Sequence, residues 1–208
     1  MKNFKTEQES FWAGQFGSDY IDRNKSEKLL ASNIRFFSDA LKGIKKISSC
    51  MEFGANIGMN VKALQVLYPG VDFHGVEINS LAADQLSALI NEEHVHRTSI
   101  LDFEVERQWD LVFTKGVLIH INPEVLDDIY EKLFLTSRRY ILLAEYYNPS
   151  PVDIPYRGYS NKLFKRDFAG DLMKKFPNVQ LVDYGFSYHL DLNFPQDDIT
   201  WFLMEKSN

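Results

Sequence analysis

The sequence predicts an α/β domain built around a mostly parallel sheet that is covered by helices on both faces. From Ile47 onward, strand-like and helix-like segments alternate, as they do in right-handed βαβ units. Residues 138–147 (RRYILLAEYY) are almost entirely apolar, which is typical of a strand buried on both faces. The last two strand-like segments, 179–188 and 198–206, have no helix between them, so we expect them to pair antiparallel.

The individual elements follow from hydrophobic periodicity and from helix start and stop signals. In residues 58–69 the apolar side chains fall on one helical face, and Pro69 ends the helix. Ser80 and Asn122 are expected to cap the N-termini of the next two helices. We expect strands at residues 46–53, 71–78, 93–100, 109–118, 138–147, 179–188 and 198–206, and helices at residues 26–42, 58–69, 80–92, 122–137 and 164–177.

Length and composition narrow the class of protein. The 208 residues suggest one domain, with residues 46–208 as the core and residues 1–45 as a separate helical segment. The net charge of −6 argues against general binding of nucleic acid or of an anionic membrane surface. The single cysteine, Cys50, excludes an internal disulfide and fits a reducing cytoplasm. The first 20 residues contain neither a signal-peptide core nor a membrane-spanning segment.

A glycine-punctuated turn follows the first strand and is the most informative motif. A phosphate-binding P-loop is excluded, because no Lys-Ser/Thr pair follows Gly58. A nicotinamide-binding turn requires glycines at positions 56 and 59, where this chain has Asn56 and Met59. The pattern acidic-x-G-x-G-x-G of S-adenosylmethionine (SAM) methyltransferases fits better, reading EFGANIG from Glu52. The middle glycine is replaced by Asn56, and asparagine tolerates left-handed backbone well.

Two further acids fall at the ends of successive predicted strands. Glu77 closes the second strand, 23 residues after Gly54, where a carboxylate can accept hydrogen bonds from both ribose hydroxyls of an adenosine ligand. Asp102 follows the third strand, where methyltransferases place an acid against the adenine amino group, with Ile100 or Leu101 packing on the ring. Together with Glu52, these acids favour SAM over a dinucleotide.

The chain resembles a known family at this point. The segments FWAGQFGSDYIDRN, EFGANIGMN, GVEIN and DLVFTKGVLIHINPE look like those of the class I SAM methyltransferases associated with pseudaminic acid biosynthesis. The resemblance implies a Rossmann-like fold with a seven-stranded, mostly parallel sheet whose last strand is antiparallel, and an N-terminal helical lid over residues 1–45. It also implies a bacterial enzyme associated with surface nonulosonic sugars, which leaves the substrate itself open.

The resemblance also assigns cofactor contacts by position. The glycine turn would line the methionine end of SAM, the end of the second strand would hold the ribose, and the segment after the fourth strand would cover the donor. Trp12, Phe16, Tyr20 and Arg23 would fold over the pocket as a lid. The predicted cofactor-binding residues are Tyr20, Arg23, Glu52, Phe53, Gly54, Ala55, Asn56, Gly58, Glu77, Ile78, Leu101, Asp102, Lys115, Gly116 and Leu118.

Candidates for the acceptor side follow the fourth and fifth strands. His120 is the first candidate for a general base because imidazole titrates in the useful range, although it could equally be hydrogen-bonded and inert. Tyr146 is the second catalytic candidate, and Lys115 could pair with an acceptor carboxylate. Aromatic faces suit sugar rings and arginine suits a carboxylate, although these aromatics could instead pack the loop onto the sheet. The predicted acceptor-binding residues are Trp12, Tyr147, Asn148, Tyr156 and Arg157.

The predicted function is methyl transfer from SAM, with S-adenosylhomocysteine (SAH) as product, to a nonulosonic sugar or nucleotide-sugar precursor. The alternatives are an NAD-dependent oxidoreductase and a non-catalytic SAM- or SAH-binding adaptor. His94 and His96 have the spacing of half a metal site, but no nearby cysteine completes it, so no metal is expected. The choice between O- and N-methylation, the oligomeric state and whether the lid closes over its own core stay open.

Overall fold

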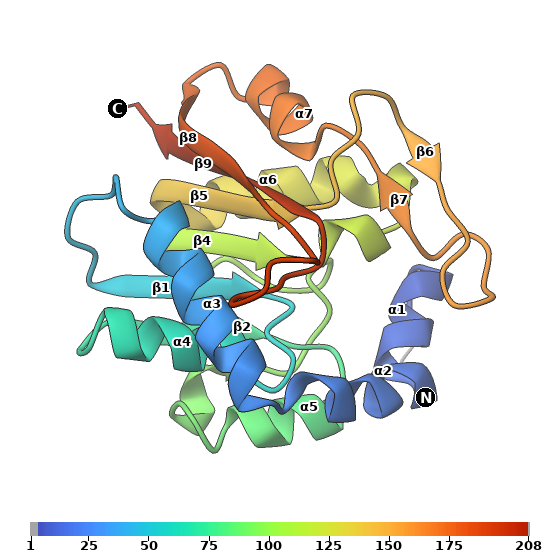
Figure 1. The fold of residues 1–208 in the computed structure, drawn as a ribbon. Helices are drawn as coiled ribbons and strands as arrows, with labels where there is room; N and C mark the ends of the chain where they lie inside the picture. Colours follow the sequence, from blue (N-terminus) through green and yellow to red (C-terminus); the bar gives the residue numbers. More distant parts are fainter. Residues whose placement is uncertain (1–3, 208) are drawn as a thin grey trace.

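The computed structural model describes residues 4–207, which form a seven-stranded sheet between two helical layers (Figure 1). The strand order is β3-β2-β1-β4-β5-β9-β8, and only β9 runs against its neighbours. This arrangement confirms the predicted fold class. The strands are β1 (Ser49–Phe53), β2 (Asp72–Val76), β3 (Val95–His96), β4 (Trp109–Lys115), β5 (Ser137–Glu145), β8 (Val179–Ser187) and β9 (Ile199–Lys206), with β6 (Val152–Asp153) and β7 (Phe164–Lys165) forming a separate small pair.

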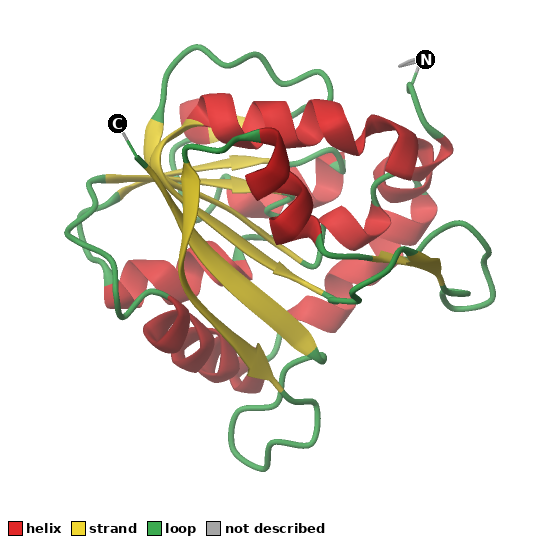
Figure 2. Ribbon diagram, turned by 90° about the horizontal axis from the view of Figure 1, so that it is seen from above, coloured by secondary structure: helices red, strands yellow, loops and turns green. Residues whose placement is uncertain are grey.

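The helical layers on the two faces bury separate parts of the core. One face packs against α3 (Glu27–Ala40), α4 (Met59–Leu67) and α5 (Ser80–Leu86), and the other against α6 (Leu126–Thr136) and α7 (Phe168–Lys175). Figure 2 shows the twisted sheet between them. Because both faces are covered, the central strands are apolar on both sides, as the sequence of β5 predicts.

The N-terminal segment divides into two parts. Helices α1 (Glu7–Ala13) and α2 (Gln15–Tyr20), followed by the 3-10 turn η1 (Ile21–Asn24), lie beyond the carboxyl ends of the strands (Figure 1). Helix α3, by contrast, contributes Phe36, Phe37 and Ala40 to the main core. Of the described part of residues 1–45, α1 and α2 therefore lie at the carboxyl ends of the strands, and α3 belongs to the core.

The structure corrects several predicted boundaries. Strand β3 is only two residues long, because the 3-10 turn η2 (Glu92–His94) takes up the beginning of the predicted strand. The N-cap residue of α5 is Asn79 and not Ser80, which is the first residue of the helix. The Asn79 side chain accepts hydrogen bonds from the N–H groups of Leu81 and Ala82. Phe164 and Lys165, which were predicted to begin a helix, form strand β7 and pair with β6. Helix α7 begins at Phe168, after its N-cap residue Asp167.

The segment after β4 is also more irregular than predicted. The 3-10 turns η3 (Leu118–His120) and η4 (Pro123–Val125) precede α6, so the helix begins at Leu126 and not at Asn122. Asn122 does cap the turn, as its side chain accepts a hydrogen bond from the N–H of Glu124. These turns bring residues 116–120 back over the end of the sheet.

Candidate active site

A cavity of about 390 Å³ opens at the carboxyl ends of β1, β2 and β4, the position at which open α/β sheets bind ligands. Its wall combines the turn after β1, the ends of β2 and β4, and the N-terminal helices. The predicted site residues that line it are Trp12, Tyr20, Gly54, Ala55, Asn56, Glu77, Ile78, Leu101, Lys115, Gly116 and His120.

The glycine turn has the left-handed backbone that its sequence predicts. Gly54, Asn56 and Gly58 have φ angles of 78°, 49° and 83°. The Asn56 side chain stabilises its own unusual conformation by accepting a hydrogen bond from the N–H of Ile57 (2.7 Å). A Cβ at Gly58 would come within 2.8 Å of Leu86, so glycine there lets α4 begin close to α5. Gly58 thus shapes the turn without lining the cavity.

Glu77 is the best-held carboxylate of the cavity. It is buried, and its two oxygens each accept a 2.7 Å hydrogen bond from a backbone N–H, of Asn56 and of Asn79. Burial raises the pKa of this carboxyl group, against the opposing effect of these hydrogen bonds. The contacts fix the carboxylate to the glycine turn on one side and to the cap of α5 on the other.

Glu52 lies behind the cavity wall rather than in it. One carboxyl oxygen accepts a 2.7 Å hydrogen bond from the Asn60 side chain, which does line the cavity, and the other oxygen is buried without a partner among the described residues. Burial raises the pKa of Glu52 to about 8. A buried polar atom without a partner is costly, and Oε1 of Gln8, a residue of the cavity wall, is likewise buried without a partner among the described residues.

The wall after β3 differs from the prediction at one residue. Ser99, Ile100 and Leu101 line the cavity. Asp102 does not, because its carboxylate is half exposed and forms an ion pair with Lys5 (2.6 Å). The structure therefore gives Asp102 no place in this wall, and Phe53 likewise packs in the core, against Phe103.

The segment after β4 is held by an acid that the sequence analysis missed. Glu145 is buried at the end of β5 and accepts hydrogen bonds from the Thr114 hydroxyl (2.8 Å) and from the N–H groups of Val117 (3.2 Å) and Ile119 (3.3 Å). Burial raises its pKa to about 7. Glu145 could have been predicted from its position at the end of a strand, the same signal that identified Glu77. Glu145 fixes the backbone on which His120 stands, while the Leu118 side chain is buried in the core.

His120 is buried but lines the cavity. Its Nδ1 lies 2.5 Å from the carbonyl oxygen of Lys162, an acceptor, so Nδ1 carries the proton and Nε2 has a free lone pair. Burial lowers the pKa of His120 to about 4, so the ring is neutral at pH 7. The imidazole packs between Trp12 and Tyr156, with ring centroids 4.7 and 4.9 Å away. It is thus a fixed hydrogen-bond acceptor.

Helices α1 and α2 close over the core of their own chain. Trp12 and Tyr20 line the cavity. The Asn79 side chain donates to the carbonyl oxygen of Trp12 (3.2 Å) and to the Ser18 hydroxyl (3.2 Å), tying both helices to the end of β2. A Cβ at Gly17 would come within 1.8 Å of the Trp12 carbonyl oxygen. The aromatic-glycine segment of the sequence is therefore a tightly packed helical corner.

The loop between β6 and β7 is fastened to α1 by contacts that the sequence did not reveal. Lys162 forms an ion pair with Glu7 (2.6 Å), and the Gln8 side chain donates to the carbonyl oxygen of Asn161 (3.0 Å). Tyr156 packs on Phe16 at 6.0 Å between ring centroids. This packing role is the alternative that the sequence analysis left open for the loop aromatics.

The other predicted acceptor residues, and Arg23 of the predicted cofactor-binding set, lie outside the cavity wall. Arg157 stacks over the Tyr156 ring, and Arg23 over the Tyr20 ring. Tyr147 is partly exposed beside Phe202, and Asn148 donates to the carbonyl oxygen of Ser150. The predicted site residues that do not line the cavity are Arg23, Glu52, Phe53, Gly58, Asp102, Leu118, Tyr146, Tyr147, Asn148, Tyr156 and Arg157.

Tyr146 and Lys115 both lie near Asp197, and Lys115 and Asp197 line the cavity, Asp197 from the loop between β8 and β9. Burial, followed by the nearby Asp197 carboxylate, raises the pKa of the Tyr146 phenol, so Tyr146 stays protonated at neutral pH. Burial also lowers the pKa of the Lys115 ammonium, against the attraction of Asp197 and Glu52. The sequence analysis missed this loop, which also contributes Gln196 to the wall; Gln196 is held by a hydrogen bond to Asn33 of α3 (2.9 Å).

No protein-family profile and no curated protein sequence matches the chain. Solved structures do match. A SAM-dependent methyltransferase from Leishmania major is 12% identical over 97% of this chain and 82% of its own, with a TM-score of 0.71. The 1,6-didemethyltoxoflavin-N1-methyltransferase of Burkholderia thailandensis, with toxoflavin precursor and SAH bound, is 12% identical over 100% and 93%, with a TM-score of 0.72. The magnesium protoporphyrin IX methyltransferase of Synechocystis, with SAM bound, is 12% identical over 99% and 100%, with a TM-score of 0.63.

These likenesses, at low identity, define the fold: the chain has the Rossmann-like fold of class I methyltransferases. Fold alone does not determine chemistry, so function is argued from the site. Within residues 4–207, no helix combines the length and the apolar character needed to cross a bilayer.

Proposed function

We propose that this protein is a SAM-dependent methyltransferase. The observation that carries the proposal is the buried Glu77 carboxylate, held by two backbone N–H groups at the cavity wall beside the left-handed Gly54–Gly58 turn. A carboxylate in this position keeps lone pairs for a ribose diol, and a turn without the third glycine of the nicotinamide pattern disfavours a pyrophosphate.

The residues of the cavity fit SAM on further grounds. SAM, when bound, supplies a methyl group on a positively charged sulfonium. The apolar side chains of Ile78, Ile100 and Leu101 offer a surface for adenine. Glu52 accepts a hydrogen bond from the Asn60 side chain, and Asn60 offers the cavity a polar group for the methionine end.

His120 is proposed to orient the acceptor. Its Nδ1–H is committed to the Lys162 carbonyl oxygen, which leaves Nε2 to accept a hydrogen bond from an acceptor hydroxyl or amine. A pKa of about 4 makes the ring a weak base, so alignment and exclusion of water carry more of the catalysis than proton removal. Glu145 positions this residue by fixing the N–H groups of Val117 and Ile119.

The proposed acceptor is a nonulosonic sugar of the pseudaminic acid type, or its nucleotide-sugar precursor, in the synthesis of a bacterial surface glycan. This proposal rests on the sequence resemblance. It is supported by Lys115, a partly buried cation in the cavity that suits a carboxylate, and by the aromatic faces of Trp12 and Tyr20. Such precursors are made in the cytoplasm, which fits a chain whose one cysteine is a buried free thiol.

Incubation with SAM labelled in its methyl group tests the proposal. Nonulosonic acids and their nucleotide-activated forms serve as acceptors, with neutral hexoses as the comparison set. Label in a nonulosonic acceptor, with equimolar SAH, supports the whole proposal. SAM binding without turnover on any acceptor would favour a SAM-binding adaptor and would contradict the catalytic assignment.

A further inference from the structure

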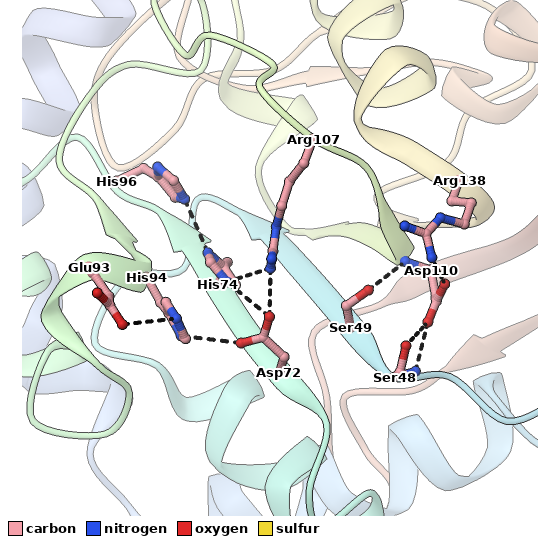
Figure 3. Close-up of polar contacts among 10 residues, drawn as sticks. All are labelled: Ser48, Ser49, Asp72, His74, Glu93, His94, His96, Arg107, Asp110 and Arg138. Atoms are coloured by element: carbon pink, nitrogen blue, oxygen red, sulfur yellow. Dashed lines mark hydrogen bonds and ion pairs between the residues drawn. The ribbon is translucent and has the colours of Figure 1, made fainter.

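A cluster of histidines lies at the β2–β3 edge of the sheet, and none of its members lines the cavity. Asp72 and His74 are two residues apart on β2, and His94 and His96 are two residues apart on η2 and β3. Figure 3 shows these side chains joined by a continuous series of polar contacts that includes Arg107. In the sequence, only His94 and His96 are close enough to suggest a pair of ligands. Asp72 and His74 join them through the pairing of β2 with β3.

Arg107 identifies which atoms of the cluster are acceptors. One guanidinium nitrogen lies 2.6 Å from a carboxylate oxygen of Asp72 and 2.7 Å from Nε2 of His74. Because arginine only donates, Nε2 of His74 has no proton, and Nδ1 donates to Nε2 of His96 (3.3 Å). A lone pair of Asp72 and the lone pair of His74 Nε2 therefore both point at the Arg107 guanidinium.

The spacing of the acceptor atoms is that of a coordination polyhedron. Asp72 lies 3.3 Å from Nε2 of His74 through one oxygen and 3.3 Å from Nδ1 of His94 through the other. Neighbouring ligands of a tetrahedral Zn²⁺ with bonds of about 2.1 Å are about 3.4 Å apart. Within residues 4–207, this is the one group of three potential ligands whose donor atoms all lie within 4.8 Å of one another.

We propose that Asp72, His74 and His94 form a binding site for a divalent transition-metal cation of the zinc type, and that Arg107 holds the cation position in the metal-free protein. Two imidazoles and one carboxylate select a borderline cation such as Zn²⁺ over Mg²⁺ or Ca²⁺, which prefer oxygen ligands. His96 supplies the outer hydrogen bond that a metal-bound histidine usually makes through its second nitrogen.

The side chains that must move are free to do so. Arg107 is 49% exposed, and its guanidinium also lies 4.6 Å from the ring centroid of Trp109, a contact that it can keep after leaving the Asp72 carboxylate. His94 stacks on His74 with ring centroids 3.9 Å apart, so its ring must turn before both rings face one ion. Its side chain is 22% exposed, which leaves room for this rotation.

A metal bound at this site would stabilise the β2–β3 edge of the sheet, where the strands pair over a short length. Strand β3 has only two residues, and its pairing with β2 covers the register Gly75–Val95 and Val76–His96. A metal bound by β2 and η2 would stabilise the folded state by mass action at this edge. The inference is independent of methyl transfer, because the ligands lie outside the proposed SAM cavity.

Calorimetric titration with Zn²⁺ tests the proposal on tag-free protein stripped of metal with a chelator. We expect saturation at one equivalent, and Co²⁺ should give the visible absorption bands of a four-coordinate site. His94→Gln should weaken Zn²⁺ binding at least ~10-fold, because it removes a ligand. Arg107→Ala should tighten binding by ~10-fold, because it removes the competing cation.

The matched control is Arg138→Ala. Arg138 pairs with Asp110 (3.3 Å) in a neighbouring network that contains no histidine, as Figure 3 shows. This variant should leave Zn²⁺ affinity unchanged. The proposal is overturned if wild-type protein shows no saturable Zn²⁺ binding, if His94→Gln binds as tightly as wild type, or if Arg107→Ala and Arg138→Ala behave alike.

Discussion

The two halves of the cavity wall are built in different ways. The half that holds Glu77 and the Gly54–Gly58 turn comes from two adjacent parallel strands, and backbone N–H groups fix its carboxylate. The half around His120 comes from segments far apart in the chain: His120 contacts Trp12 of α1 and the Lys162 carbonyl oxygen of the loop before β7. The first half is set by strand ends, and the second by packing between distant segments.

Under the proposed function, the first half binds the cofactor, and the second half binds the acceptor. Strand ends fix a wall rigidly, as binding of the cofactor requires, whereas loops and terminal helices can be rebuilt for each acceptor. Variants of the first half should therefore change cofactor affinity, and variants of the second half should change turnover.

The largest effect is expected for Glu77→Ala. The substitution leaves the N–H groups of Asn56 and Asn79 without their acceptor and removes the ribose partner, so SAM affinity should fall at least ~100-fold. Calorimetry measures the loss, with circular dichroism to verify folding. Asp102→Ala is the control, and we expect less than a ~3-fold change because Asp102 pairs with Lys5 outside the wall. An equal loss in both variants would restore Asp102 to the cofactor site.

The next effect is expected for His120→Asn on the acceptor half. Asparagine can still donate to the Lys162 carbonyl oxygen but removes the imidazole Nε2, so kcat should fall by ~100-fold while SAM affinity stays within ~3-fold. Steady-state kinetics measures the first quantity and calorimetry the second. Tyr146→Phe serves for comparison and should keep kcat within ~3-fold. A larger loss in Tyr146→Phe than in His120→Asn would move the reacting centre to Tyr146.

A smaller effect is expected for Gly17→Ala in the helical corner of α2. The added Cβ would meet the Trp12 carbonyl oxygen at 1.8 Å, so the backbone must shift, at a cost of ~1–3 kcal/mol in the free energy of unfolding. Gly43→Ala is matched, since its Cβ would lie 4.0 Å from Val182, an ordinary contact. Equal unfolding free energies for the two variants in urea would show that α1 and α2 are not packed as described.

The last prediction is a pH dependence of stability that comes from Glu52. Its pKa is raised to about 8 in the folded protein from an ordinary 4.5, so between these values the folded state keeps a proton that the unfolded state releases. Stability from this group is therefore present below pH 4.5 and is lost as pH rises toward 8. Glu52→Gln, which mimics the protonated form, should match wild type at pH 5 and exceed it in unfolding free energy at pH 9. Parallel pH profiles for the two proteins would contradict the burial of Glu52.

The parts predictable from the sequence are those with local causes. The left-handed turn could be predicted because glycine has no Cβ to clash at positive φ and asparagine tolerates the same conformation. Glu77 could be predicted because its position at the end of a strand fixes the direction of its side chain. The same reasoning placed Asp102 at the cavity, whereas in the structure its half-exposed carboxylate pairs with Lys5 outside the wall.

The parts that could not be predicted depend on contacts across the chain. Glu145 fixes the His120 segment from the far end of β5, and Asp197 reaches the cavity from the loop before β9. Neither residue stands in a motif of its own. The pairing of Lys162 with Glu7 spans 155 positions, so no local pattern could reveal that α1 closes over its own chain.

The most direct test of the central claim is calorimetric titration of the purified protein with SAM, SAH and NAD, in parallel with Glu77→Ala. The account predicts micromolar binding of SAM and SAH that is lost in the variant, and no binding of NAD. Binding of NAD alone would contradict it, and would make the turn after β1 a dinucleotide site.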